Sequence, residues 1–228
     1  YEHIFADNNS RDTTPDILRS LAQKNDKVKV ILNGRNVGPF RSAFNALLAA
    51  EGDAVLVFLA ADLQDPPELL PELVKRWKQG KKVVYGIRAN REESFTMRRI
   101  RQMYYKLVST LAHIDIPQNV GEFQLIDKQV VSELKKCDDY YPYIRGLIAY
   151  CSYDADGVEY VWKRRNKGIT KNNIWDLIDQ AINGLISFSS LPLRMFMLAG
   201  LTISFTAVIY ALIQFLINLF SSAPLSAP

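Results

Sequence analysis

The segment from Ala54 to Glu68 joins a short apolar run to an acidic loop that ends in two prolines. Ala54–Leu59 is apolar throughout and contains two valines, the pattern of a strand buried on both faces. Pro66 cannot continue a strand ladder, and Pro66-Pro67 ahead of Glu68 is typical of a helix start. The segment therefore predicts a strand, a loop and a helix, which is the repeating unit of an α/β fold.

Three side chains in this loop carry oxygen atoms, namely Asp62, Gln64 and Asp65. In open α/β sheets, ligands gather outside the carboxyl ends of the strands. Carboxylate and amide oxygens there suit a hard divalent cation that holds a diphosphate. An acidic loop without any metal is the alternative, and the loop alone does not separate the two.

Strands and helices are expected to alternate around this segment. The expected strands are Tyr1–Asp7, Val28–Leu32, Ala54–Leu59 and Lys82–Ile87, and the expected helices are Pro15–Gln23, Pro39–Ala50 and Glu68–Lys78. This order predicts a mostly parallel sheet with helices on both faces. No GxGxxG motif occurs, so the fingerprint of dinucleotide binding is absent.

The second half of the chain is less regular. Its expected elements are a helix within Ser94–Ala112, a strand at Gly121–Ile126, a short helix at Lys128–Lys135 and a strand at Val158–Lys163.

Met195–Phe220 is a run of 26 residues without a charged side chain. As a helix rising about 1.5 Å per residue it would be roughly 39 Å long, whereas the bilayer core is about 30 Å thick. A buried core helix is the alternative, but the length and lack of charge favour a membrane span.

Asn172–Leu191 has the apolar stripe of an amphipathic helix, which a core helix would also have. Its position before the span favours a helix that lies in the membrane interface.

Charge and cysteine content bear on the partners and the compartment. The formal charge of +4 on 228 residues is not strongly basic, and no nucleic-acid partner is expected. Arg194 stands just before the apolar run and no cationic residue follows it, so the rest of the chain is predicted to lie on the cytoplasmic side. Cys137 and Cys151 fit that compartment as reduced thiols and match no metal motif. We expect a fragment that lacks an N-terminal strand and helix, and a second span is left open.

Several segments, in this order, resemble glycosyltransferase family 2, and within it the branch that acts on polyprenyl phosphates. They are Asp7-Asn8-Asn9-Ser10-Arg11-Asp12, Arg35-Asn36-Val37-Gly38 and Ala60-Ala61-Asp62-Leu63-Gln64-Asp65-Pro66-Pro67-Glu68. Gly121-Glu122-Phe123-Gln124-Leu125 resembles the Gly-Asp-Phe-Arg-Leu segment of that branch, and Arg165 with Gly168-Ile169-Thr170-Lys171 resembles its Arg-x-x-Gly-x-Ser/Thr-Lys segment. The resemblance spans nearly the whole chain.

The resemblance implies a GT-A fold and an inverting transfer of a sugar from a UDP- or GDP-sugar to a polyprenyl phosphate, for synthesis of cell-envelope glycans. Asp7, Asn36 and Asp62 would bind the nucleotide-sugar. Asp62 and Gln64 match the positions that contact a divalent ion, Mg²⁺ or Mn²⁺. Asp65 and Glu122 are the candidate catalytic carboxylates.

Three departures from the family pattern qualify these roles. Ala60 replaces the first acid of the usual Asp-Ala-Asp, which removes one contact to the metal or the ribose. Asp7-Asn8-Asn9-Ser10 stands where the family has Asp-Asp-Gly-Ser, and Glu122 and Gln124 replace the Asp and Arg of Gly-Asp-Phe-Arg-Leu. Because a phosphate monoester has its second pKa near about 6 and is already largely ionised, Glu122 could orient the acceptor or the ion rather than take a proton. A structural role remains the alternative for both Asp7, as a turn cap, and Glu122, as an ion-pair partner.

Arg165 and Lys171 are the candidate ligands of the acceptor phosphate, because guanidinium grips two phosphate oxygens and ammonium acts as a point charge. Attraction to anionic membrane lipid is the alternative for both. The expected division is a catalytic domain at 1–171, an interfacial helix at 172–193 and a membrane segment with its tail at 194–228. A different lipid-linked glycan acceptor, a membrane-tethered binding protein without turnover, and a homo-oligomer all remain open.

Overall fold

The computed structural model describes residues 1–89, 117, 119–137, 139, 142–151, 153–162 and 174–220, together with residues 96, 99, 100, 102, 103, 106 and 110. The predicted helix within Ser94–Ala112 lies mostly outside these residues, and those described between 96 and 110 are helical.

Strands and helices alternate in the first part of the chain, as predicted. The strands are β1 (His3–Asp7), β2 (Val28–Leu32), β3 (Ala54–Leu56) and β4 (Val83–Arg88). The helices are α1 (Thr14–Lys24), α2 (Pro39–Leu48) and α3 (Leu70–Lys78), and a 3-10 turn, η1 (Pro67–Leu69), precedes α3. Proline stands in the first turn of each of these helices, where its missing N–H leaves no bond unmade.

The second part contains β5 (Val120–Asp127), α5 (Lys128–Leu134), α6 (Ile144–Tyr150), β6 (Ala155–Tyr160), α7 (Ile174–Phe188) and α8 (Leu191–Phe220). α6 was not predicted from the sequence, although Ile144, Leu147 and Ile148 are buried at helical spacing. β6 begins and ends three residues before the strand predicted at Val158–Lys163.

The strands form two sheets among the described residues. β1 and β2 form a parallel pair, and the other sheet has the order β3-β5-β4-β6. β4 and β6 run parallel, but β5 runs antiparallel to both β3 and β4. The sheet is therefore mixed, whereas the sequence analysis expected a mostly parallel one. The sequence did not show the direction of β5, because a strand buried on both faces has the same apolar pattern in either direction.

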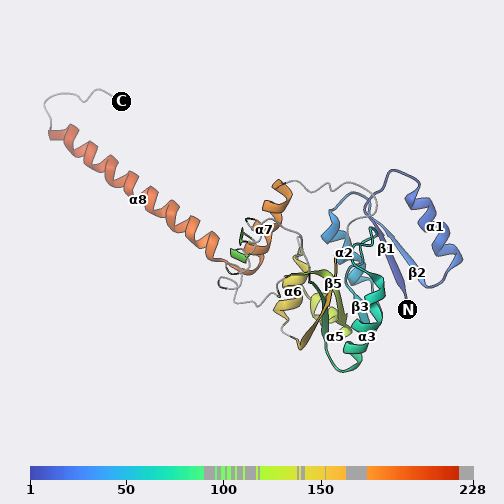
Figure 1. Ribbon diagram of the computed structural model, residues 1–228. Coiled ribbons are helices and arrows are strands. Elements are labelled where there is room, and N and C mark those ends of the chain that lie inside the picture. Colours follow the sequence, from blue (N-terminus) through green and yellow to red (C-terminus); the bar gives the residue numbers. More distant parts are fainter. Residues whose placement is uncertain are drawn as a thin grey trace.

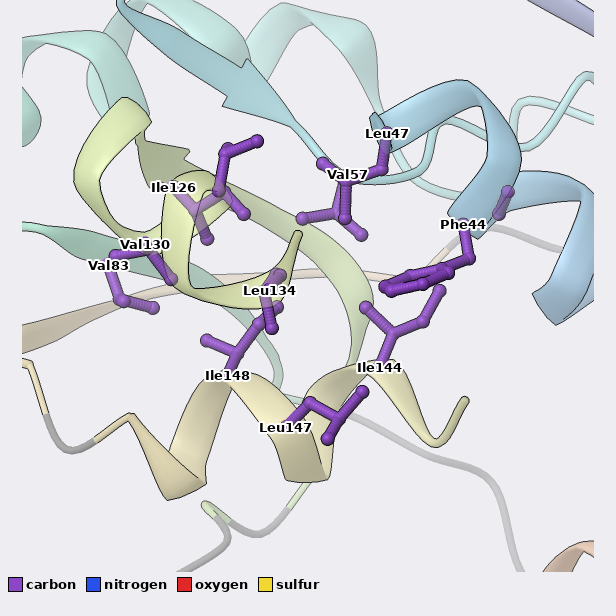
Figure 2. Packing of buried hydrophobic residues seen from close by; sticks show 12 residues of the cluster. Phe44, Leu47, Val57, Val83, Ile126, Val130, Leu134, Ile144, Leu147 and Ile148 are labelled. Atoms are coloured by element: carbon purple, nitrogen blue, oxygen red, sulfur yellow. The ribbon is translucent and has the colours of Figure 1, made fainter. Parts of the chain in front are cut away.

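Helices cover both faces of the four-stranded sheet, as predicted, because neighbouring residues of its strands point to opposite sides. One core cluster contains Val83 and Ile126 with residues of α2, α5 and α6. In Figure 2, Phe44 and Leu47 of α2 lie at the upper right, Ile144 and Ile148 of α6 lie below, and Leu134 of α5 lies between the two helices. The second cluster contains Val84 and Leu125 with Leu73 of α3.

α8 extends away from the α/β body as a single long helix, and α7 lies between the two (Figure 1). Within the described part of the chain, Leu193–Phe220 is the one helix that is long and apolar enough to cross a membrane, and its side chains are not buried in the protein. α8 begins at Leu191, so the helix break lies at Ser189 and Ser190, slightly before the predicted domain boundary at 194.

Candidate active site

Two loops meet at the carboxyl ends of β1 and β2, because these strands are parallel neighbours. Asn8 joins the loops: its Nδ2 donates to Asn36 Oδ1 at 2.8 Å, and its Oδ1 accepts from the Val37 N–H at 2.9 Å. Asn36 Oδ1 also accepts from the N–H of Gly38, whose φ of 84° favours glycine at the start of α2. The structure thereby places the loops of Asp7 and Asn36, two of the residues predicted to bind the nucleotide-sugar, side by side.

Asp7 is the last residue of β1 and is buried. Its Oδ2 accepts a hydrogen bond from the Ser10 N–H at 3.0 Å, across a turn in which Asn9 has a φ of 64°. The carboxylate therefore has the turn-capping role that the sequence analysis kept as an alternative. Binding a nucleotide base remains a proposal for it.

Asp62 and Gln64 belong to one tight turn after β3. The Leu63 N–H donates to the Ala60 carbonyl at 3.0 Å, and the Gln64 N–H donates to Asp62 Oδ1 at 3.2 Å. Leu63 has a φ of 54°, which is uncommon for a residue with a side chain and occurs in turns of this kind. The turn keeps one carboxylate and one side-chain amide two residues apart.

Asp62 and Gln64 suit a magnesium ion that also binds waters and phosphates, rather than a metal held by protein ligands alone. Among the described residues, no group of three or more His, Cys, Asp and Glu side chains could hold a metal. Mg²⁺ commonly takes one or two protein carboxylates and completes its shell with waters and substrate phosphates. Asp62 and Gln64 could hold an ion in that way together with a diphosphate.

Asp65, in the loop after β3, is 4% exposed and contacts one residue from each of two strands, β4 and β6. Arg88 Nη2 is 3.3 Å and 3.4 Å from its two carboxylate oxygens, and the Tyr160 hydroxyl donates a short hydrogen bond to Oδ1. Arg88 Nε donates to the Tyr160 hydroxyl oxygen at 3.2 Å, and its guanidinium lies 4.8 Å from the centre of the Trp162 ring. We call Asp65, Arg88 and Tyr160 the buried triad.

The register of the sheet builds the buried triad, because Arg88 and Tyr160 are direct partners on β4 and β6. Burial raises the pKa of the Tyr160 phenol, and its hydrogen bond to Asp65 raises it further. The phenol therefore stays protonated at neutral pH and remains a hydrogen-bond donor. Arg88 and Tyr160 were not predicted from the sequence as residues of the site. A charged side chain at the end of the apolar strand Val83–Ile87 was the available signal for Arg88.

Glu122 lies on β5 beside Arg145 of α6. Arg145 Nε is 3.7 Å from Glu122 Oε1, and Arg145 Nη1 donates to the Val120 carbonyl at 3.0 Å. Gln124, which replaces the family's arginine, is buried, and its Nε2 donates to the Gly121 carbonyl at 2.8 Å. Glu122 thus has the ion-pair contact that was kept as its alternative role.

Gly121 brings the buried triad close to Glu122. A Cβ atom on Gly121 would lie 2.8 Å from Arg88 Nη2, so the guanidinium packs against the bare backbone at this point. The buried triad therefore touches the backbone of β5 next to Glu122, whereas the carboxylate of Glu122 faces Arg145 of α6. Arg165 and Lys171, predicted to bind the acceptor phosphate, lie outside the described residues.

Comparison with known proteins identifies the class of enzyme. The sequence model of the family described as "Glycosyl transferase family 2" matches residues 1–135. The chain belongs to this family and is a glycosyltransferase. The family resemblance drawn from the motifs, and the GT-A fold class that it implied, are confirmed.

Two curated relatives illustrate the similarity. The uncharacterized glycosyltransferase YkcC of Bacillus subtilis is 34% identical over 227 residues, which are 99% of this chain and 70% of that protein. The bactoprenol glucosyl transferase of Shigella phage SfV is 33% identical over 210 residues, 92% of this chain and 68% of that one. The chain thus spans about two thirds of the length of these relatives.

A solved structure is also similar. Residues 1–349 of S. aureus TarS, crystallised in complex with UDP, align over 80% of this chain and 55% of that chain, with 17% identity and a TM-score of 0.42.

Proposed function

We propose that this chain transfers a sugar from a nucleotide-sugar, UDP- or GDP-linked, to a polyprenyl phosphate at a membrane. The observation that carries the proposal is the 33% identity to a bactoprenol glucosyl transferase across 92% of the chain. This match extends well beyond residues 1–135, which the family model covers, and so includes much of the part that leads to the membrane helix.

On the side of the nucleotide-sugar, the proposed ligands are Asp7, Asn36 and Asp62. Asp7 ends β1, Asn36 lies in the loop after β2, and Asn8 joins the two segments, so a nucleotide bound there would lie near both. A divalent ion held by Asp62 and Gln64 would neutralise the diphosphate and stabilise the charge that develops on the departing nucleotide. Ala60 leaves this site with one acid fewer than the family pattern has.

On the acceptor side, an oxygen of the lipid phosphate is the proposed nucleophile. It forms a bond to the anomeric carbon while the bond from that carbon to the diphosphate oxygen breaks, so the nucleoside diphosphate leaves and the configuration inverts. Because the phosphate is already largely ionised near neutral pH, no residue needs to remove its proton. Arg165 and Lys171 would bind this phosphate, and Glu122 would orient it or the ion.

For Asp65 we propose a positioning role rather than contact with the substrate. Its carboxylate is buried and receives hydrogen bonds from Arg88 and Tyr160. It directly follows Gln64, so the buried triad would fix the end of the turn that carries Asp62 and Gln64. Holding these ligands in place lowers the cost of assembling the reacting groups.

The membrane helix would bring the enzyme to its acceptor. α8 spans the bilayer in this proposal, α7 lies in the interface, and the catalytic domain is cytoplasmic because Arg194 stands at the start of the span. The division into 1–171, 172–193 and 194–228 describes these three parts. A lipid-anchored acceptor then reaches the site by diffusion within the membrane.

The acceptor can be tested with membranes that contain the full chain, a radiolabelled nucleotide-sugar, Mg²⁺ and added polyprenyl phosphate. The expected product is extractable into chloroform, labile to mild acid and absent when the metal is chelated. Label that remains only in water-soluble products, or that appears only on a larger lipid-linked glycan, would contradict the proposal.

A further inference from the structure

The end of α7 packs onto the part of the catalytic domain that holds Glu122. Phe188, the last residue of α7, joins the core cluster built around α5 and α6. Its ring centre is 6.0 Å from that of Tyr143 and 6.3 Å from that of Tyr150, with the ring planes tilted in both pairs. Tilted aromatic pairs at this separation attract each other beyond their apolar burial.

Gly146 makes room for this packing. A Cβ atom at Gly146 would overlap both the Tyr143 ring and the Phe188 ring. Any larger residue at this position of α6 would therefore push the two rings apart. The fit is a close contact between a helix that leads to the membrane and a helix of the catalytic domain.

Tyr143 connects this contact to Arg145. Arg145 Nε donates to the Tyr143 hydroxyl at 3.0 Å, and the Arg145 guanidinium lies 5.1 Å from the centre of the same ring. The other end of that guanidinium holds the Val120 carbonyl at 3.0 Å, and Nε lies 3.7 Å from Glu122 Oε1. Phe188, Tyr143, Arg145 and Glu122 therefore form an unbroken series of contacts, which we call the junction chain.

α8 begins directly after Phe188. Ser189 is buried, and its hydroxyl oxygen accepts from the Leu191 N–H at 3.2 Å. The Ser190 carbonyl accepts from the Arg194 N–H at 3.0 Å, which closes the first turn of α8. Only Ser189 and Ser190 separate Phe188 from α8, which contains the proposed membrane span, so the position of the span constrains the position of the ring.

We infer that Phe188 is a positioning residue that sets the place of Glu122 through Tyr143 and Arg145. The inference rests on the proposed function, in which Glu122 orients the acceptor phosphate or the ion. The junction chain connects Glu122, in the proposed acceptor site, to α8, the helix proposed to span the membrane that holds the acceptor. Glu122 would then be aligned only when the α7–α8 junction is seated on α6.

The test compares Phe188→Ala with Phe188→Leu, which keeps most of the apolar volume, and with Phe205→Ala, which removes the same ring from a position of α8 that is 68% exposed. We expect Phe188→Ala to lower kcat by about tenfold, because small misplacements of reacting groups are costly. We expect the KM for the nucleotide-sugar to stay unchanged, Phe188→Leu to recover most of the loss, and Phe205→Ala to match the wild type. Wild-type kcat in Phe188→Ala would overturn the inference.

A double variant separates positioning from a general structural defect. If Phe188 acts through Glu122, adding Phe188→Ala to Glu122→Gln should change kcat by less than about twofold, because coupled residues are not additive. The same loss in both backgrounds would mean that Phe188 acts elsewhere and would overturn the inference.

Hydrogen exchange provides a readout that needs no activity. In the full chain in detergent, Phe188→Ala should speed exchange of the amides at Val120–Glu122, since Arg145 no longer holds the Val120 carbonyl firmly. Unchanged exchange there would overturn the inference by itself, even where activity is too low to measure. If the wild type transfers no sugar to polyprenyl phosphate while the exchange effect is present, the proposed function fails but the junction chain stands.

Discussion

Asp65 is buried, unlike a catalytic acid that contacts substrate in an open site. Its carboxylate is enclosed by Arg88 and Tyr160, which come from β4 and β6. A buried ion pair of this kind adds little net stability, but the loss of one partner leaves an uncompensated charge in the interior.

Replacing Asp65 by Asn should therefore destabilise the folded protein more than the same replacement of an exposed aspartate. We expect Asp65→Asn to lower the free energy of unfolding by about 3 kcal/mol, since the Arg88 guanidinium, on a side chain only 18% exposed, loses its charged partner. Asp16→Asn is the matched control: Asp16 pairs with Arg19 at 2.8 Å, but the two side chains are 80% and 58% exposed. Chemical denaturation of both variants measures the difference, and equal effects would contradict the role of the buried triad.

Gly121 gives a second test at the residue scale. A Cβ atom there would lie 2.8 Å from Arg88 Nη2, and Arg88 is already held by Asp65 and Tyr160. We expect Gly121→Ala to cost about 1–3 kcal/mol of stability, as overpacking usually does. Gly34→Ala is the control, because nothing lies within 4 Å of a Cβ at that position. A Gly121→Ala protein as stable as the Gly34→Ala protein would rule out the close packing of Arg88.

The sequence predicted some of these residues and not others, for a physical reason. Asp62, Gln64 and Asp65 lie in one short segment that directly follows an apolar strand, so the local sequence pattern was enough to predict them as site residues. Arg88 and Tyr160 are 72 residues apart and meet only because β4 and β6 pair in this register. Pairing between distant strands has no local pattern, so their contact with Asp65 could not be predicted.

Among the elements, the junction of β5 and α5 depends on one buried carboxylate, Asp127. It caps α5 by accepting from the Gln129 N–H at 2.9 Å, and it also accepts from Trp77 Nε1 at 2.9 Å and Lys82 Nζ at 3.2 Å. Burial by itself raises the pKa of this carboxyl group, but these hydrogen bonds and the Lys82 charge outweigh burial, and the pKa is lowered.

The lowered pKa predicts how stability depends on pH. A carboxylate with a depressed pKa in the folded state stabilises the protein above its unfolded pKa of about 3.9, and this contribution is lost as the pH falls through the folded value. Asp127→Asn keeps a side chain that can cap α5 but does not titrate. Denaturation between neutral and acidic pH should therefore show a smaller loss of stability below about pH 4 in Asp127→Asn than in the wild type. Identical acid dependence would contradict the role assigned to Asp127.

Element boundaries were predictable where periodicity and turn residues agree. β2 has the bounds predicted for it, and α2 and α3 begin within two residues of their predicted starts. The direction of β5 was not predictable, because a strand buried on both faces has the same pattern in either direction. α6 has only seven residues, too short for helical periodicity to be distinctive.

For the whole molecule, the main feature is a long apolar helix that leaves the α/β body. Its lack of charge and its length could be read from the composition, whereas the packing of Phe188, at the end of α7, against α6 could not. If α8 spans the bilayer, the wild-type chain should stay in the membrane pellet after an alkaline carbonate wash. Val208→Arg with Leu212→Arg should release it or prevent its insertion, because each charge near the centre of a span costs about 2.5–3.5 kcal/mol.

Val208→Ala with Leu212→Ala keeps the helix apolar and serves as the control for that experiment. It should fractionate as the wild type does. Release of the wild-type chain by carbonate would contradict a membrane span.

The most direct test of the proposed function is mass spectrometry of the lipid extract after reaction of the full chain with a nucleotide-sugar, Mg²⁺ and polyprenyl phosphate. The expected result is a polyprenyl phosphate whose mass has grown by one sugar residue, with an equal amount of nucleoside diphosphate released, and neither product in Asp62→Ala. Polyprenyl phosphate that remains unmodified while the sugar is transferred elsewhere, or full product from Asp62→Ala, would contradict the proposal.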